Sequence, residues 1–81
     1  MGIPATIKEI REDGTAVVDV FGNDAIVDVT LVPDVKPGDK VIVHAGAAIA
    51  KLDEEQWREA YEIWKQVLET LDREFEAAVE Q

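Results

Sequence analysis

The feature that most constrains the fold of this chain is a change of sequence pattern at Leu52. Before this residue, short runs rich in β-branched residues alternate with turn signals that contain glycine. After it, no glycine or proline interrupts residues 53–81, where apolar residues recur at intervals of three and four. Because strands repeat with a period of two and helices with a period of 3.6, the pattern predicts a mainly β first part followed by one long amphipathic helix.

The first part contains four clear strand candidates and a shorter fifth one. We expect strands at residues 3–11, 15–21, 25–29, 40–45 and 47–52. The residue types between them favour tight turns. These turn signals are Glu12-Asp13-Gly14, Gly22-Asn23-Asp24 and Lys36-Pro37-Gly38-Asp39. The sequence therefore predicts a small β-barrel of four to five strands over residues 1–52. In the first strand, strict alternation would place Glu9 on the same face as Ile3, Ala5 and Ile7.

The second part is expected to be a single helix over residues 53–81 that packs on the barrel within one domain. Asp53 is a good N-cap, and Gln56 completes a capping box. Trp57, Tyr61 and Trp64 lie on the apolar stripe and are expected to pack on the barrel.

A straight helix of about 28 residues is roughly 42 Å long, whereas a strand of six residues spans only about 20 Å. Phe75 and Val79 are therefore expected to lie beyond the barrel, as a helix interface that needs another surface. A second copy of the chain, a partner protein or a bend in the helix could supply that surface, and we favour self-association into a homo-oligomer.

The composition excludes several classes of partner. The net charge is −10, from 18 acidic and 8 basic residues, so the chain lacks the clustered cations that nucleic acids and anionic membranes attract. No apolar run has the length of a membrane span, and no apolar segment follows Met1 as in a signal peptide. We therefore expect a cytoplasmic protein. The chain contains no serine, a bias that fits either a natural thermophilic protein or a computational redesign.

The sequence contains no catalytic constellation. There is no cysteine or serine nucleophile, and the single histidine has no partner pattern for nucleophilic catalysis. The glycines form no phosphate-binding motif. Glu54 and Glu55 are adjacent on the helix, so they point about 100° apart and suit the helix dipole better than acid–base catalysis. We predict that the chain is not an enzyme.

Four segments stand in an order and spacing found in one known family. Ile3-Pro4-Ala5 is similar to an amino-terminal Ile-Pro-Gly segment, and residues 16–22 and 35–41 are similar to a second strand and the start of a fourth. Residues 43–55 are similar to a His-x-Gly-x-Ala-Ile segment that leads into a Leu-Asp-Glu-Glu helix start. Together they resemble the HypC/HupF/HybG-type chaperones of [NiFe]-hydrogenase maturation.

The resemblance implies an OB-like β-barrel with a carboxy-terminal helix. It also implies two partners, a HypD-type scaffold protein and the precursor of the hydrogenase large subunit. Chaperones of this type help to deliver an iron centre that carries cyanide and carbon monoxide, and a cysteine next to their initiator methionine holds it. This chain has Gly2 at that end and contains no cysteine. We therefore expect a non-catalytic protein-binding module that carries neither iron nor another cofactor.

By the same resemblance, the partner-binding residues are Gly2, Ile3, Pro4, His44 and Gly46. No residue is assigned as a metal ligand, because a protein metal site normally needs three or four ligands and His44 is a single imidazole. Simpler structural interpretations stay open for two of these residues. His44 could be a strand histidine bonded to a backbone carbonyl, and Gly46 could serve only to end a strand.

Three hypotheses follow from the sequence. The first is a maturation chaperone homologue that binds proteins, and it predicts that the amino-terminal segment and His44 lie together on one exposed surface. The second is a redesigned or idealised barrel-plus-helix scaffold with no biological partner. The third is a homo-oligomer held by the helix.

Overall fold

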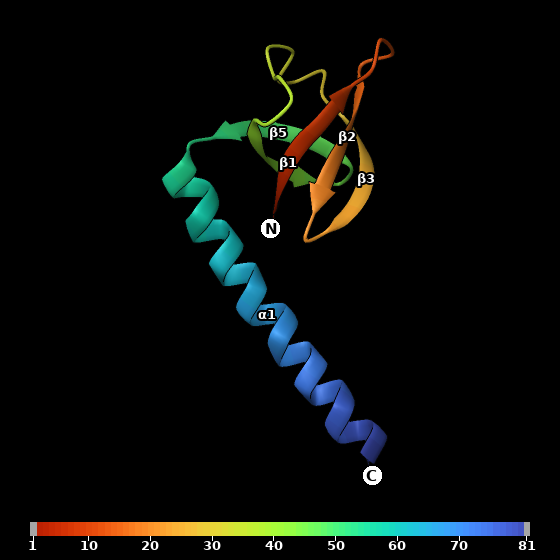
Figure 1. The fold of residues 1–81 in the computed structure, drawn as a ribbon, viewed down its shortest axis with the longest axis vertical. Coiled ribbons are helices and arrows are strands. Elements are labelled where there is room, and N and C mark those ends of the chain that lie inside the picture. The colour runs from red at the N-terminus through yellow and green to blue at the C-terminus, as the bar shows by residue number, and fades with distance from the viewer. Residues whose placement is uncertain (1, 81) are drawn as a thin grey trace.

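A computed structural model describes the backbone of residues 2–80 and the side chains of residues 2–74. Within this part of the chain, five strands form a closed barrel and one helix follows them (Figure 1). The elements are β1 (Ile3–Ile10), β2 (Thr15–Val20), β3 (Asn23–Asp28), β4 (Lys40–His44), β5 (Ala47–Leu52) and α1 (Glu54–Glu80). The expected fold class, mainly β with one carboxy-terminal helix, is confirmed.

The strands follow one another around the barrel in the order β1-β2-β3-β5-β4, and β4 closes it by pairing with β1. All neighbouring pairs are antiparallel except β3 and β5, which are parallel and meet at Asp28 and Ala47. A five-stranded barrel with this mixture of pairings is OB-like. The order brings the beginning of β1 and the end of β4 side by side, although they lie about 40 residues apart in the sequence.

The barrel interior is filled by small and β-branched side chains, as a narrow barrel requires. Ile7, Val18 and Val41 are the largest side chains that are fully buried. The segment between β3 and β4 adds three more buried valines, Val29, Val32 and Val35, to the same core cluster. Because this core contains no disulfide, burial of these apolar side chains has to supply most of the barrel's stability.

The turn between β2 and β3 differs from the expected one. Phe21 and Gly22 both have positive φ, 51° and 85°, which is the backbone of a two-residue hairpin turn whose twist matches that of the flanking strands. Asn23 and Asp24, expected in the turn, are instead the first two residues of β3. The prediction was wrong because a bulky aromatic residue is uncommon in the left-handed region and favours a strand.

The expectation for Glu9 was also wrong. The pairing of β1 with β2 shifts between Ile7 and Glu9, so strict alternation ends at this β-bulge. Glu9 is exposed, and Ile10, not Glu9, pairs with the buried Ala16. Apart from these two places, the ends of the strands lie within a residue or two of the expected ones.

Helix α1 begins with the capping box that the sequence predicts. The backbone N–H of Gln56 donates to Oδ1 of Asp53 at 2.8 Å, and the backbone N–H of Asp53 donates to Oε1 of Gln56 at 3.0 Å. The helix starts beside β5, passes the beginning of β1 and continues well beyond the barrel (Figure 1). No helical stretch among the described residues is both long and apolar enough to cross a membrane.

Candidate functional site

The amino-terminal residues lie against the end of β4. Ile3 pairs with Val43, and Pro4 pairs with Ile42. Because side chains alternate along a strand, Ile3 and Val43 point toward the core, and Pro4 and Ile42 point to the outer face. His44 follows Val43 and lies on the same outer face as Ile42. Continued by one residue, the same pairing would bring Gly2 opposite His44.

Gly2 is held closely between the barrel and the helix. A Cβ atom added to Gly2 would overlap Cγ1 of Ile42 and would lie 3.1 Å from its Cδ1 and 3.4 Å from the carbonyl oxygen of Val43. On its other side, Nε1 of Trp64 donates a hydrogen bond to the carbonyl oxygen of Gly2 at 2.7 Å. The backbone at Gly2 therefore contacts both β4 and α1.

Three stacked aromatic rings hold the first half of α1 on the barrel. The ring of Tyr61 lies 4.9 Å from the ring of Phe21 and 4.9 Å from that of Trp57, with interplanar angles of 25° and 23°. Phe21 belongs to the β2–β3 turn, so its left-handed backbone conformation directs a large ring at the helix. The expectation that Trp57, Tyr61 and Trp64 pack on the barrel is confirmed.

A half-buried lysine lies beside this stack. Nζ of Lys40 lies 4.7 Å from the centroid of the Trp57 ring, a cation–π distance, and donates to Oγ1 of Thr6 at 3.2 Å. Lys40, Thr6, Trp57 and Tyr61 line a cavity of about 480 Å³ between the barrel and α1, together with Pro4, Asp19, Phe21 and Gly22. Pro4 is itself buried, so it lies beneath the helix while Gly2 and Ile3 are partly exposed.

His44 and Gly46 flank the turn between β4 and β5. His44 is exposed, and Ala45 and Gly46 both have positive φ, 53° and 80°. The carbonyl oxygen of Gly46 accepts a hydrogen bond from the backbone N–H of Asp28 at 3.0 Å, where β3 and β5 meet. Gly46 therefore shapes a tight hairpin, as the simpler interpretation of this residue states.

Asp28 lies beside the β4–β5 turn, because its backbone N–H donates to Gly46. Hydrogen bonds from the hydroxyl and the backbone N–H of Thr30 hold the pKa of Asp28 below its ordinary value of 3.8. Within the described part of the chain, no group of three or more His, Cys, Asp or Glu side chains is arranged to hold a metal ion.

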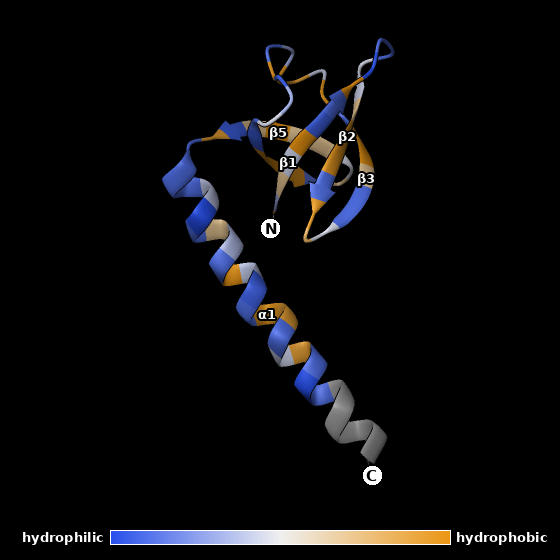
Figure 2. Cartoon of the chain, viewed as in Figure 1, coloured by the Kyte–Doolittle hydropathy of each residue, from blue (hydrophilic) through white to orange (hydrophobic). Residues whose placement is uncertain are grey.

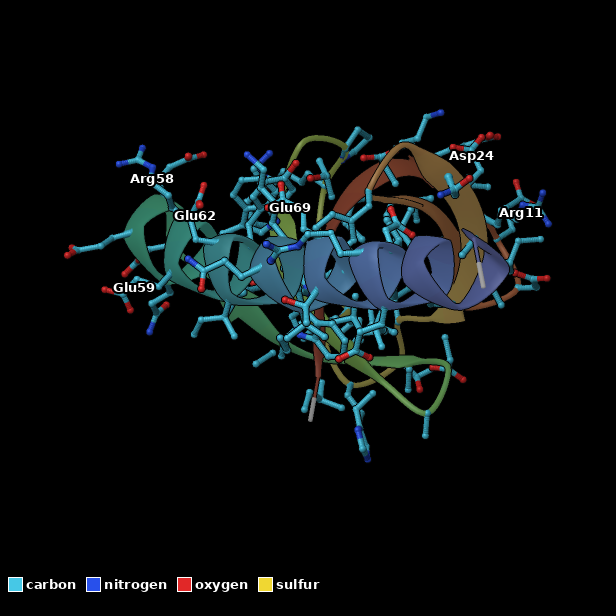
Figure 3. All side chains as sticks on the ribbon, turned by 90° about the horizontal axis from the view of Figure 1, so that it is seen from below. Arg11, Asp24, Arg58, Glu59, Glu62 and Glu69 are labelled. Carbon is cyan, nitrogen blue, oxygen red and sulfur yellow. The ribbon has the colours of Figure 1, made fainter. Side chains whose placement is uncertain are left out.

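The outer surface of α1 carries charge along one side and apolar residues along another. In Figure 3, Arg58, Glu59 and Glu62 lie on the side of the molecule where α1 begins, and Arg11 and Asp24 lie on the opposite side. Apolar positions continue along α1 past the barrel (Figure 2). The exposed ones are Ile63, Val67, Leu68 and Leu71. The side chains of Phe75 and Val79, the expected helix interface, lie outside the described residues.

Two contacts at this site could not be read from the sequence pattern. Phe21 was expected to end a strand, and its role as the stacking partner of Tyr61 depends on the turn geometry. The bond from Trp64 to Gly2 joins residues that are 62 positions apart. The only sequence signal for these contacts was the helical spacing of Trp57, Tyr61 and Trp64. This spacing predicts that the three side chains share one face of the helix, but it does not predict which barrel residues they contact.

Comparisons with known proteins agree with the resemblance. The model of the HupF/HypC family matches residues 1–64. The hydrogenase maturation factor HypC of Rhizobium leguminosarum bv. viciae is 45% identical over 56 residues, which cover 69% of this chain and 75% of that protein. HypC of Helicobacter hepaticus is 34% identical over 82 residues, which cover 99% of this chain and 94% of that protein. This chain belongs to the HupF/HypC family.

Proposed function

We propose that this chain is a hydrogenase maturation chaperone that works by binding other proteins and catalyses no reaction. Its similarity to two proteins named hydrogenase maturation factor HypC, one of them along nearly the whole chain, supports this proposal. The observation that carries it furthest is the pairing of Ile3 with Val43. This pairing places the amino-terminal segment beside His44, the two parts that the family resemblance assigns to partner binding.

The proposed binding surface, here called the amino-terminal edge, consists of Gly2, Ile3, Pro4, His44 and Gly46. Its members would act in different ways. Gly2 and His44 would contact the partner because they are at least partly exposed, and Ile3, whose side chain points inward, would contribute its backbone. Pro4 would fix the direction of β1 from beneath the helix, and Gly46 would set the hairpin that follows His44. Such a surface recognises a partner by shape and backbone hydrogen bonds, which suits a protein ligand.

The partners proposed for this edge are a HypD-type scaffold protein and the precursor of the hydrogenase large subunit. The cargo passed between them would be the iron centre with its cyanide and carbon monoxide ligands. A soft thiolate donor holds such iron in the family, and this chain contains no cysteine. Gly2 has no side-chain donor, so the chain is expected to bind the partner and to carry no iron.

An anaerobic binding experiment with a HypD-type scaffold protein tests this function. The chain is compared with His44→Ala and with Arg11→Ala, a matched control. Arg11 follows the far end of β1, about 30 Å from Gly2 along an extended strand at roughly 3.3 Å per residue. We expect His44→Ala to weaken binding several-fold and Arg11→Ala to leave it unchanged. Absence of binding by the unmodified chain, or equal effects of the two substitutions, would contradict the proposal.

A second variant addresses the iron. Met-Cys-Leu-Ala is placed before Ile3, in place of Met1 and Gly2, and partner-bound iron is measured after the same pull-down. We expect the variant to retain iron and the unmodified chain to retain none, because only the variant offers a thiolate. Binding of the scaffold by neither protein would instead favour the second hypothesis, a barrel-plus-helix scaffold with no partner.

A further inference from the structure

One hydrogen bond connects α1 to the first residues of the barrel. Nε1 of Trp64 donates to the carbonyl oxygen of Gly2 at 2.7 Å, which is a short and well-placed distance for an indole donor. Trp64 is half-buried. The bond therefore holds a backbone group of the proposed amino-terminal edge by a side chain of α1.

This bond fixes more than one atom. The carbonyl of Gly2 and the N–H of Ile3 belong to the same planar peptide group, so holding the oxygen sets the orientation of both. The next residue, Pro4, has no N–H to offer to a neighbouring strand. The first residues of β1 thus have one ladder donor fewer than an ordinary strand, and the indole of Trp64 supplies a restraint from outside the sheet.

Trp64 is itself positioned by its neighbours on the helix. Tyr61 and Leu68 lie three residues before it and four residues after it, so they share its face of α1. Tyr61 is stacked on Phe21. Ile3, Phe21, Trp64 and Leu68 line a common apolar cavity of about 240 Å³ with Val20 and Asn23. The indole that bonds to Gly2 is consequently in place only while α1 is docked on the barrel.

The other tryptophan of the helix provides a contrast. Nε1 of Trp57 is also buried, yet among the described residues it has no hydrogen-bond acceptor. Both rings pack against the barrel side of α1, and only the donor of Trp64 reaches the amino-terminal segment. Replacing each tryptophan by phenylalanine therefore separates two effects. Both replacements make the ring smaller, but only the one at Trp64 removes a hydrogen bond.

We propose that Trp64 is a positioning residue for the amino-terminal edge. Its indole N–H orients the Gly2–Ile3 peptide group, so docking of α1 and presentation of this segment to a partner are coupled. When the helix leaves the barrel, the hydrogen bond is lost and residues 2–3 are no longer held in this orientation. Conversely, a partner that binds these residues in the hydrogen-bonded orientation stabilises the docked helix. That this segment binds a partner rests on the proposed function, whereas the positioning itself does not.

The test compares Trp64→Phe with Trp57→Phe, which remove the same atoms from the two rings. Two readouts come from nuclear magnetic resonance, the carbonyl carbon shift of Gly2 and the hydrogen-exchange rate of the Ile3 amide. We expect Trp64→Phe to move the carbonyl shift and to speed exchange roughly two- to tenfold, the factor that one net hydrogen bond represents. We expect Trp57→Phe to leave both values close to those of the unmodified chain. Equal changes in the two variants, or no change in Trp64→Phe, would overturn the proposal.

Two additions keep this test decisive. Protection of the Val18 and Val41 amides in the core reports whether each variant remains folded. If Trp64→Phe loses that protection, benzothienylalanine at position 64 replaces it, since this residue keeps the bicyclic shape and lacks the N–H. Affinity for the HypD-type scaffold is measured in parallel. Faster exchange with no scaffold binding by any protein supports the positioning role and rejects the proposed function.

Discussion

Replacing Tyr61 by alanine removes the central ring of the three that hold α1 on the barrel. This ring stacks on Phe21 and on Trp57 at 4.9 Å each. An aromatic pair contributes about 0.5–1.5 kcal/mol beyond the area that it buries, so the two pairs contribute about 2 kcal/mol. Burial of much of the ring adds roughly another 1 kcal/mol. We expect Tyr61→Ala to lower the free energy of unfolding by about 3 kcal/mol.

Urea and thermal unfolding, followed by far-UV circular dichroism and tryptophan fluorescence, measure this loss. For a chain of this size, 1 kcal/mol corresponds to roughly 4–8 °C in Tm, so Tm should fall by about 12–24 °C. The control is Ile63→Ala on the same helix. Its side chain is 54% exposed, and exposed substitutions usually change stability by less than about 0.5 kcal/mol.

The two variants together test whether the stacked rings hold α1 on the barrel. If Tyr61→Ala lowers stability no more than Ile63→Ala does, the stacked rings do not hold the helix. The coupling of α1 to the amino-terminal edge would then lose its structural basis. A loss near 3 kcal/mol with an unchanged control would assign the stabilisation to the stack.

Three further predictions concern the amino-terminal edge, the distal helix and acid stability. Gly2→Cys is expected to lower the free energy of unfolding by about 1–3 kcal/mol, because the Cβ of the new cysteine would overlap the Ile42 side chain. In a double-mutant cycle followed by thermal unfolding, Ile42→Ala should recover part of this loss. Deletion of residues 71–81 is expected to shift the Tm of the barrel by less than about 2 °C. The reason is that Leu68 is the last described helix residue that lines a cavity together with barrel residues. A larger drop in a thermal scan would show that the distal helix supports the barrel. The lowered pKa of Asp28 contributes stability above its ordinary value of 3.8, and this contribution is lost as the pH falls through the lower folded pKa. The Tm difference between the unmodified chain and Asp28→Asn should therefore shrink from pH 7 to about pH 2.5, and a difference that stays constant would show that this ionisation does not contribute.

Local patterns in the sequence were sufficient to predict the elements of the fold. Runs of β-branched residues separated by glycine turns predicted the strands, and the capping pair of Asp53 and Gln56 predicted the start of α1. These signals act over a few residues, so they can be read without knowing the tertiary structure. The resemblance added the OB-like class, which the strand order β1-β2-β3-β5-β4 confirms.

Contacts that depend on tertiary packing were missed. A bulky residue such as Phe21 has little reason to adopt positive φ by itself, and packing of its ring on Tyr61 helps to maintain that conformation. The bulge in β1 depends on how β2 aligns with it, which the alternation of a single strand does not report. The bond from Trp64 to Gly2 requires the docked helix, so no local pattern predicts it.

The position of α1 decides which surfaces of the barrel remain for recognition. OB-like barrels commonly bind oligonucleotides through a strand face and adjacent loops, and such binding needs clustered cations that release counterions. In this chain Lys40 lies under the helix against Trp57, and Lys8 is paired with Asp24 at 2.8 Å. With 18 acidic residues against 8 basic ones, the exposed surface opposes a polyanion. At the proposed amino-terminal edge, where Gly2 approaches the end of β4, backbone groups are held by both the sheet and the helix. We therefore expect recognition at this edge to depend on backbone orientation more than on charge, and to vary little with salt concentration.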